Sequence, residues 1–574
     1  MRKMKAGFAL LAVGALALSG CSGSKGGSEG GKGGSSESSK ELPVSDYNKV
    51  DPAELQDGGT LKLAFDAYPE QFNPFHVDGN TVDIASTLAA FVSPMNWLYS
   101  KDGGSFEPNK NYVESYEFND KGEGDAAMVV KLKLNPSAKW NSGTPITVND
   151  YIATWKACSH QVEGVTCASD DGWKQISSIE PGANEFEVVA KYSEKYPDWS
   201  ANFSTVGPAA GLSDQATFDT GWLDAVASEK FGTGPFHITK GDPATNVITL
   251  ERNPNWWGPK AKLDTVTISI LKPEAKAQAY ANKELDVLDM IVDSSTYATA
   301  KGRDDGAIKM STSVQWRHLT FNSRAEALKD KKVRQAILKG IDTKDITASD
   351  LAGLPSAEMN MHLGNHFFMP DQPGYEDNSV KYDPEGAKKD LEALGYKLNA
   401  AGYYEKDGKT LGFKFLRIPD VPTSANEGAM LTDMMKEIGV KVEYTDIESK
   451  KFFSKVIGGE YEVTAFAWNG TPYPMANIGQ IYGNPFDEKG ELVNSNFTGL
   501  DVPEIDKLVG EVAKETDVEK RRALTNEADK LVWENVMNVP LYYRANITAI
   551  PANLANYGST AFESLPVENI GYTK

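Results

Sequence analysis

Cysteine and histidine, the side chains that most metal sites and many nucleophilic enzymes use, are scarce in this sequence of 574 residues, which has three cysteines and six histidines. No His-Glu-x-x-His arrangement occurs. His362 and His366 could share one helix face, but Gly364 weakens that helix and no acidic third ligand is adjacent. We therefore expect no metal site, no cofactor and no catalytic residues. Because acidic residues are abundant, a glycosidase-like pair of carboxylates stays open as an alternative.

Basic residues are also in the minority, with 59 Lys and Arg against 80 Asp and Glu, so the formal net charge is −21 at pH 7. Loss of an N-terminal segment with Arg2, Lys3 and Lys5 would leave −24. An acidic surface of this kind repels nucleic acid and anionic lipid, so we expect no nucleic-acid partner. The composition, with 40% hydrophobic and 24% charged residues, is that of a folded globular protein, and the length predicts two or more lobes.

Long apolar runs are absent after the first 21 residues. Those residues are typical of an export signal: a basic start, MRKMK, then a short apolar segment, AGFALLAVGALAL, and then SGC. Leu18–Cys21 (LSGC) resembles the lipobox of bacterial lipoproteins, in which the cysteine thiol receives a diacylglyceryl group; ordinary secretion with a leftover thiol is the alternative. Residues 22–56 begin as Gly/Ser low complexity and predict a flexible tether. We expect an exported protein that acyl chains such as palmitate on Cys21 anchor to the outer face of the cell membrane.

The other two cysteines, Cys158 and Cys167, lie nine positions apart in CSHQVEGVTC. In an oxidising exterior such a pair predicts a disulfide, which here would staple a short local loop. A zinc site would need more ligands at closer spacing than the nearby His160 provides.

Strand and helix patterns alternate most clearly in residues 411–468. Three strands, LGFKFLR, VKVEYT and YEVTAFAW, are separated by two segments with apolar residues at helical spacing. This β-α-β-α-β order predicts a parallel sheet, and ligands of open sheets of this type bind beyond the carboxyl ends of the strands. The last strand runs into AWNGTPYP, so we expect Trp468–Tyr473 at that edge.

Several segments resemble one family, the extracellular solute-binding proteins of oligopeptide and dipeptide ABC importers (family 5, cluster C). The most specific match is GTGPFHITKGDPATNVITLERNPNWWG (232–258), which is close to the family pattern GTGPY…L-x-R-N-P-x-Y-W. AKWNSGTPITVNDYIATWKA (138–157) and other segments match in the expected order from about residue 58 to about residue 550.

The resemblance implies an α/β, two-lobed, periplasmic-binding-protein-like fold (type II, cluster C) with a double-strand hinge and a ligand enclosed between the lobes. The hinge strands would lie near VQWRHLTFN and VPLYYRAN. The implied divisions are a signal peptide at 1–21, a tether at 22–56, lobe I with an extra subdomain at 57–310, lobe II at 311–539, and a C-terminal return to lobe I at 540–574.

The same resemblance suggests ligand-binding residues. In peptide-binding relatives, the segment that matches AWNGTPYP carries a tryptophan that walls the pocket and, three residues later, an aspartate that pairs with the peptide α-ammonium. This chain keeps Trp468 but has Thr471 at the aspartate position, and a buried ammonium without a partner is costly. Asn469 and Thr471 can bond amides or hydroxyls, and Trp468 and Tyr473 can stack on apolar faces or sugar rings. Dipeptide-specific relatives also use an arginine; none matches here, although Arg417 is close in sequence.

Ordinary packing is the alternative interpretation for Trp468, since a strand-end tryptophan often belongs to the core. The same alternative holds for further candidates that lie in loops or hinge segments near the expected cleft. These are Phe65, Tyr68, Trp97, Trp316 and Arg317.

The sequence thus predicts a monomeric, lipid-anchored binding protein, without enzymatic activity, that captures an oligopeptide or similar polar solute. It would close around this ligand, because contacts from both lobes exist only in the closed state, and would deliver it to the ABC permease subunits in the membrane. Two alternatives stay open. One is an exported hydrolase that acts on peptides or glycosides, and the other is a receptor of the same fold that presents its ligand to a signalling partner.

Overall fold

The computed structural model describes residues 41–574, apart from 171, 477, 487–489, 491 and 493. These residues belong to one unit, Lys40–Lys574. The predicted export signal, the lipobox cysteine Cys21 and the Gly/Ser part of the tether lie outside the described residues. Within the described part of the chain, no helix combines the length and apolar character that a bilayer crossing requires.

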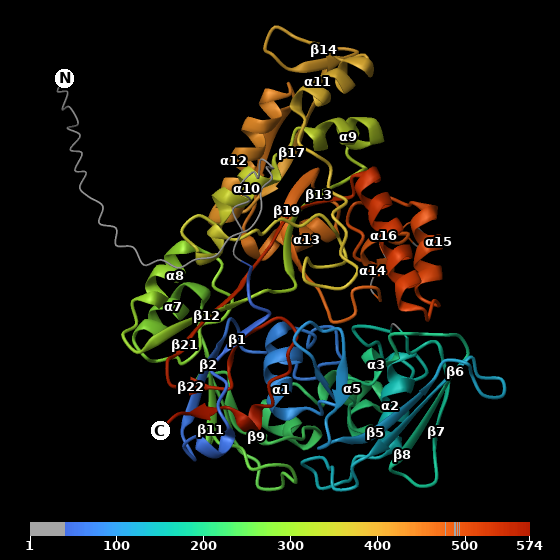
Figure 1. The fold of residues 1–574 in the computed structure, drawn as a ribbon, viewed down its shortest axis with the longest axis vertical. Helices are drawn as coiled ribbons and strands as arrows, with labels where there is room; N and C mark the ends of the chain where they lie inside the picture. The colour runs from blue at the N-terminus through green and yellow to red at the C-terminus, as the bar shows by residue number, and fades with distance from the viewer. Residues whose placement is uncertain (1–40, 171, 477, 487–489, 491, 493) are drawn as a thin grey trace, which may run out of the picture. The chain divides into compact units, whose positions relative to one another are not determined.

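A four-stranded sheet in the order β2-β11-β10-β9 forms the first part of the folded body (Figure 1). β2 (Thr60–Phe65) alternates buried and half-buried side chains, as its sequence pattern predicts, and pairs in parallel with β11 (Thr265–Ile270). β9 (Phe236–Asp242) and β10 (Val247–Arg252) complete the sheet as an antiparallel pair. Its apolar face packs on a core that includes Phe91 of the helix after β2.

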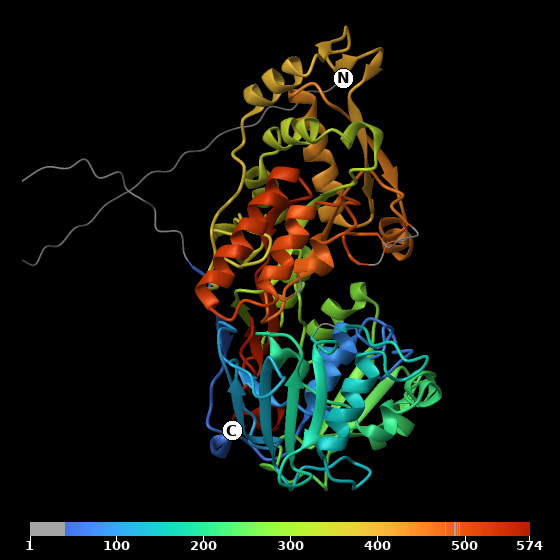
Figure 2. The same ribbon diagram turned by 90° about the vertical axis from the view of Figure 1, so that its right-hand side faces the viewer.

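A second, antiparallel sheet in the order β5-β6-β8-β7 has its own apolar core. Its strands are β5 (Val113–Asn119), β6 (Met128–Leu134), β7 (Ile176–Pro181) and β8 (Glu187–Tyr192) (Figure 2). Helix α2 (Val148–Cys158) packs against β7 and β8. This helix begins with a capping box: the side chain of Thr147 accepts a hydrogen bond from the backbone N–H of Asp150, and the side chain of Asp150 accepts one from the backbone N–H of Thr147.

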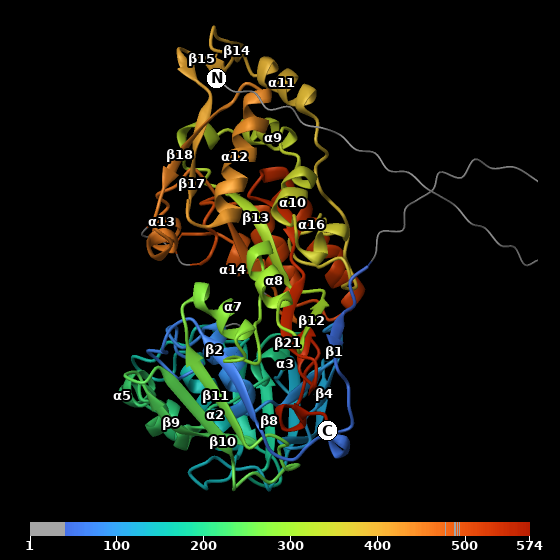
Figure 3. The ribbon, with the colours of Figure 1, turned by 90° about the vertical axis from the view of Figure 1, so that its left-hand side faces the viewer.

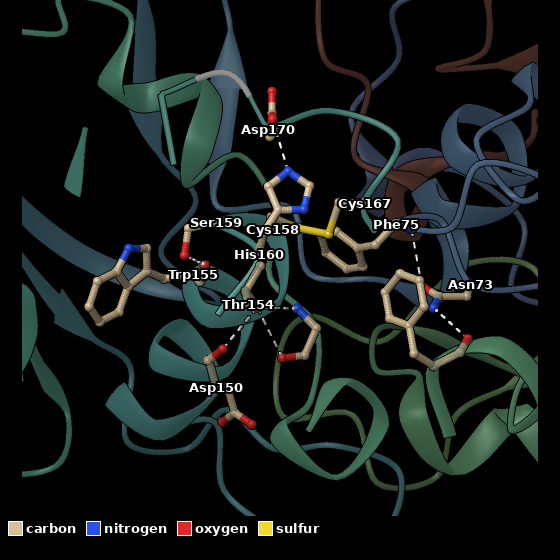
Figure 4. Close-up of a disulfide and its surroundings, with 12 residues drawn as sticks. Asn73, Phe75, Asp150, Thr154, Trp155, Cys158, Ser159, His160, Cys167 and Asp170 are labelled. Carbon is tan, nitrogen blue, oxygen red and sulfur yellow. Dashed lines mark hydrogen bonds and ion pairs between the residues drawn. A yellow bond between two sulfur atoms is a disulfide. The ribbon is translucent and has the colours of Figure 1, made fainter. Parts of the chain in front are cut away.

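The predicted disulfide is confirmed: Cys158, the last residue of α2, is bonded to Cys167. Cys167 in turn forms an isolated β-bridge with His76, and the amide of Ala168 donates to the carbonyl of Phe75 at 2.8 Å. Figure 4 shows the disulfide beside the segment of Phe75, which follows β2. The disulfide therefore holds the loop of Cys167 on the end of α2, and that loop in turn contacts the segment of Phe75 and His76 that follows β2.

Removal of this bond is expected to lower the free energy of unfolding. A closed loop of this length restricts the unfolded chain, and the typical effect of a native disulfide is about 2–4 kcal/mol. The variant Cys158→Ser/Cys167→Ser should show this loss in calorimetric unfolding, and a reductant should shift the wild-type transition toward that of the variant while leaving the variant unchanged. Equal stability of the wild-type protein and the variant would contradict the prediction.

The β-α-β-α-β prediction for residues 411–468 is confirmed. β17 (Gly412–Arg417) pairs in parallel with both β18 (Lys441–Asp446) and β19 (Val463–Asn469). Helices α12 (Pro422–Glu437) and α13 (Phe452–Ile457) make the two crossovers. These strands belong to a five-stranded sheet in the order β18-β17-β19-β13-β20, and the carboxyl end of β19 lies where the sequence places it, at Trp468 and Asn469.

Two adjacent chain segments connect this sheet to the rest of the protein. β13 (Gln315–Phe321) and β20 (Asn538–Tyr543) pair antiparallel in the five-stranded sheet, and β12 (Gly306–Ser311) and β21 (Asn546–Pro551) pair antiparallel next to them (Figure 3). Only short linkers separate β12 from β13 and β20 from β21. This is the arrangement that a double-strand hinge requires.

We keep the predicted names for the parts: lobe I is 57–310 with 540–574, and lobe II is 311–539. The helices not yet given are α1 (Ala89–Val92), α3 (Trp199–Asn202), α4 (Ala209–Leu212), α5 (Gln215–Thr220), α6 (Ala225–Ser228), α7 (Pro273–Ala281), α8 (Ser294–Lys301), α9 (Lys331–Lys339), α10 (Thr343–Asp350), α11 (Pro384–Ala393), α14 (Ile478–Tyr482), α15 (Pro503–Val512) and α16 (Val518–Asn535). The remaining strands are β1 (Ser45–Tyr47), β3 (Trp97–Tyr99), β4 (Phe106–Pro108), β14 (Lys397–Leu398), β15 (Tyr404–Lys406), β16 (Lys409–Thr410), β22 (Leu554–Ala555), β23 (Gly558–Thr560) and β24 (Gly571–Tyr572).

Candidate ligand-binding site

Trp468 packs with two aromatic rings at the carboxyl end of β19. The ring of His318, from the adjacent strand β13, is 6.1 Å from it at an interplanar angle of 10°, and the ring of Phe497 is 5.8 Å away at an interplanar angle of 16°. The indole is therefore nearly parallel to both rings. The indole Nε1 is buried and has no hydrogen-bond partner among the described residues.

His318 also has a buried ring nitrogen without a hydrogen-bond partner among the described residues. Its ring is fully buried, and burial, followed by the positive charge of Arg317, lowers the pKa of His318 well below its ordinary value. The imidazole is therefore neutral, and its Nδ1 is 3.0 Å from the hydroxyl of Thr320 and 3.2 Å from the amide nitrogen of Asn538. The amide nitrogen of Asn538 can only donate, so Nδ1 of His318 accepts and Nε2 carries the proton. That Nε2 also lacks a partner among the described residues, so two unmet donors occur in one aromatic stack.

Tyr473 extends from the same segment to lobe I. Its hydroxyl is 2.8 Å from the hydroxyl of Tyr99 and 3.0 Å from that of Ser200. Burial raises the pKa of both tyrosines, so each phenol stays neutral. Thr471 Oγ1 accepts a hydrogen bond from the amide of Tyr473 at 3.1 Å, which holds the turn between the strand and the tyrosine, while the exposed Asn469 accepts from the side chain of Gln315. The four predicted residues of AWNGTPYP thus form one continuous segment from lobe II to lobe I.

A buried ion pair joins the two lobes close to this tyrosine. Arg521 of α16 binds both carboxylate oxygens of Asp198, which directly precedes α3, with a distance of 2.8 Å from Nη1 to Oδ1. The side chains are only 5% and 8% exposed. A second pair, Lys514 with Glu194 at 2.8 Å, is exposed. Figure 1 shows α16 above the segment that contains α3.

The other aromatic candidates are placed differently. Phe65 and Trp97 are fully buried in the cores of lobe I, where the indole nitrogen of Trp97 donates to the carbonyl of Ser200 at 2.8 Å. Trp316 is 3% exposed and packs in the core of lobe II. Tyr68 is half-buried in the loop after β2, and burial raises its pKa. Phe65, Trp97 and Trp316 therefore support the fold from behind the candidate surfaces rather than form them.

Both candidate arginines already have carboxylate partners, which differs from the ligand-binding role expected from sequence. Arg317 is buried and binds Glu427 of α12 through two hydrogen bonds of 2.6 Å. Burial alone would lower the pKa of Arg317, but Glu427 raises it overall. Arg417 binds Asp446 on the adjacent edge strand at 2.6 Å and lies 3.8 Å from the ring of Tyr444. Neither guanidinium is available to hold a ligand carboxylate unless it exchanges its partner.

A buried carboxyl accompanies the Arg317 pair. Asp350 accepts hydrogen bonds from Asn426 at 2.7 Å and from Tyr542 at 3.1 Å. Burial raises the pKa of Asp350 to about 7, and the negative charge of Glu427 adds to this effect. The group belongs to the helix-packed side of the five-stranded sheet.

The structure shows no group of three or more His, Cys, Asp and Glu side chains suited to a metal ion in the part of the chain that it describes. His362 and His366 do not share a helix, because their segment is irregular. His362 binds Asp377 at 3.1 Å, and the fully buried His366 binds Asp529 at 2.7 Å.

Several residues of the site are not among those predicted from sequence. They are His318, Phe497, Tyr99, Ser200, Asp198 and Arg521. One signal was available: His318 is two residues from Trp316 on a predicted strand, and residues two apart on a strand share a face. No local pattern connects Asp198 with Arg521, since 323 positions separate them.

Comparisons with known proteins agree on one family. The model described as "Bacterial extracellular solute-binding proteins, family 5 Middle" matches residues 115–489. The chain is similar to the oligopeptide-binding protein OppA of Mycobacterium tuberculosis, with 33% identity over 577 residues that cover 99% of this chain and 94% of that protein.

Two solved structures show the same fold. The periplasmic EDTA-binding protein EppA matches with a TM-score of 0.82 and 21% identity, over 93% of this chain and 99% of its own. The oligopeptide-binding protein AppA from Bacillus subtilis, solved in complex with a nonapeptide, matches with a TM-score of 0.70 and 19% identity, over 91% and 100%. The predicted two-lobed α/β fold is confirmed.

Proposed function

Because the chain belongs to the bacterial extracellular solute-binding proteins of family 5, we propose that it captures an oligopeptide or a similar polar solute outside the cell and delivers it to the permease of an ABC importer. The observation that carries this proposal is the continuous segment from Trp468 to Tyr473. It begins at the carboxyl end of a parallel strand in lobe II and ends in hydrogen bonds to lobe I. Open α/β sheets bind their ligands at such an edge.

The groups along this segment suit a ligand with amide or hydroxyl groups. Asn469 and Thr471 carry an amide and a hydroxyl group, which can bond the amides of a peptide. Thr471 carries no charge, so the segment itself supplies no partner for a free peptide α-ammonium. Longer or blocked peptides therefore fit it better than free short ones.

In this proposal the lobes close on the ligand through the double-strand connection. The Tyr473 hydrogen bonds and the Asp198–Arg521 ion pair join the lobes, so they belong to the closed state. A ligand that contacts both lobes shifts the population toward that state. The protein binds its cargo without covalent chemistry and acts as a monomer. Acylation of Cys21 holds it at the outer face of the membrane, where the tether lets the body reach the permease.

The direct test is native mass spectrometry of the protein purified from its own host. A co-purifying peptide or polar solute supports the proposal. Turnover of a peptide or glycoside by the purified protein would instead support a hydrolase, and normal import of the ligand by a deletion strain would support a signalling receptor.

Substitution of Trp468 by alanine is expected to weaken binding of the identified ligand about 10- to 100-fold, because truncation of a buried aromatic anchor typically costs about 1.5–3 kcal/mol of binding free energy. Isothermal titration calorimetry would measure this change. Trp256→Ala is the matched control and should bind normally: it removes a partly buried tryptophan of lobe I whose indole nitrogen donates to the carbonyl of Pro259 and whose ring contacts Trp257. Unchanged affinity of the Trp468→Ala protein would show that the ligand binds elsewhere.

A further inference from the structure

A cavity of about 290 Å³ lies at the junction of the two lobes, and it is lined by aromatic side chains from both. Lobe I contributes Tyr99, Phe106 and Phe118, and lobe II contributes Phe368 and Tyr473. Since neither lobe forms it alone, the cavity exists only when the lobes are together. Any group that occupies it therefore stabilises the closed state.

The lobe I wall of the cavity is a rigid aromatic surface. Phe118 stacks on the buried Trp199 at 5.5 Å and an interplanar angle of 20°, and Phe106 contacts the same indole at 5.9 Å. Trp199 and Trp97 are in edge contact at 5.8 Å and are both buried. Phe118 nevertheless stays 41% exposed, near the end of the edge strand β5, of which only Val113 is buried. Rings held in this way bind an apolar partner with little loss of side-chain entropy.

The cavity also has polar groups in its lining: Asp102, Gln372, Arg522 and the paired Asp198 and Arg521. The Nη1 of Arg522 binds Glu519 at 2.6 Å, and its Nε is buried and has no partner among the described residues. Aromatic walls with polar groups beside them suit a peptide residue that has a large apolar side chain and backbone amide groups.

The cavity is continuous with the proposed ligand-binding segment, because Pro472, Tyr473 and Pro474 line it. Tyr473 is five residues from Trp468, and an extended chain advances at most about 3.3–3.6 Å per residue. The two places are therefore at most about 18 Å apart along the chain, a span that an extended peptide of five or six residues covers.

From these observations we propose that the cavity is a side-chain subsite of the ligand-binding region, and that it takes an aromatic residue of a bound peptide of about five residues or more. The assignment rests on the proposed function. The peptide backbone extends from the Trp468 end to the cavity, its aromatic ring packs on Phe106 and Phe118, and its backbone amide groups bond the polar side chains of the lining. Preferred cargo is thus distinguished by an aromatic residue at one position.

The experiment uses hexapeptides as probes: a hexa-alanine peptide with blocked ends, and the six versions of it that carry phenylalanine at one position. Titration calorimetry with the full folded body is expected to show one position at which phenylalanine tightens binding by about tenfold or more, because a buried aromatic ring contributes about 1.5–3 kcal/mol. Phe118→Ala should reduce this advantage to less than about threefold while leaving the affinity for hexa-alanine nearly unchanged.

Tyr116→Ala is the matched control. Tyr116 is on the same strand, contacts the same Trp199 at 5.3 Å and is 36% exposed, but does not line the cavity. The Tyr116→Ala variant should bind the preferred phenylalanine peptide as much more tightly than hexa-alanine as the wild-type protein does. A second readout does not depend on truncation: a photoreactive benzoylphenylalanine at the preferred position should cross-link to residues 99–118 or 472–475 of the wild-type protein.

The outcomes separate the subsite from the function. If hexa-alanine binds but no position favours phenylalanine, or if Phe118→Ala and Tyr116→Ala change the advantage equally, the subsite is wrong and peptide binding stands. A cross-link confined to other segments also overturns the subsite. If none of the peptides binds while the protein binds a different solute, both the peptide ligand and the subsite are wrong.

Discussion

Replacement of Asp198 by alanine is expected to lower ligand affinity about 100- to 1000-fold. In the closed state the change leaves the guanidinium of Arg521 buried without its carboxylate, and removal of one partner of a buried pair costs about 3–5 kcal/mol. When the lobes separate, water solvates Arg521 and this cost disappears. The substitution therefore makes the free energy of closure less favourable, and because the ligand binds the closed state, it weakens binding.

Glu194→Ala provides the control, since Glu194 is in the same segment of lobe I and pairs with Lys514 of lobe II. That pair is more than half exposed, and exposed pairs contribute at most about 1 kcal/mol, so affinity should fall less than about fivefold. Calorimetry measures affinity, and small-angle X-ray scattering measures how far the ligand-saturated protein closes. The double variant Asp198→Leu/Arg521→Met should recover much of the affinity, because it leaves no buried charge. Equal effects of Asp198→Ala and Glu194→Ala would show that the buried pair does not control closure.

Arg317→Met is expected to reduce the free energy of unfolding of lobe II by about 3–5 kcal/mol. The substitution strands the fully buried Glu427 carboxylate, which loses both of its 2.6 Å hydrogen bonds to the guanidinium. Asp350, whose pKa is already raised to about 7, lies next to the same pair, so its carboxyl cannot compensate the negative charge that Glu427 would keep. Urea unfolding followed by circular dichroism would measure the loss.

Arg417→Met is the control for this prediction. Arg417 also binds a carboxylate, but its partner Asp446 is 50% exposed, so the change should cost less than about 1 kcal/mol. Arg317→Met/Glu427→Leu should be more stable than Arg317→Met alone. A loss of ligand affinity without any loss of stability in the Arg317→Met protein would contradict the structural role and return Arg317 to the binding site.

Local patterns were enough to predict one long run of regular elements. The change from strand to helix periodicity in residues 411–468 predicted the order of β17, α12, β18, α13 and β19. These patterns work because burial of one face needs a period of two in a strand and 3.6 in a helix. The disulfide was predictable for a similar reason, since its cysteines are close in sequence.

The same patterns could not separate a ligand-facing aromatic from a core aromatic. Trp97, Trp316 and Phe65 have the residue types of a binding surface and are buried. Phe118, which no sequence pattern distinguishes, is exposed at the lobe junction. Arg317 is a candidate from its place in a hinge segment, whereas its partner Glu427 is 110 positions away in the sequence. Which face of a strand meets another element is decided by packing, and packing is not a local property.

The sequence by itself determined the β-α-β-α-β order of residues 411–468, the disulfide of lobe I and, through the resemblance of segments such as 232–258, the family and its two-lobed fold. It also placed Trp468–Tyr473 at a strand end. Only the tertiary structure decided what those residues contact: the rings of His318 and Phe497 beside Trp468, and the hydrogen bond between Tyr473 and Tyr99. It also decided the ion pair between Asp198 and Arg521. The reason is physical. Periodicity follows from forces between neighbours in the chain, whereas a site between lobes is built from residues hundreds of positions apart that meet only after each lobe has buried its own core.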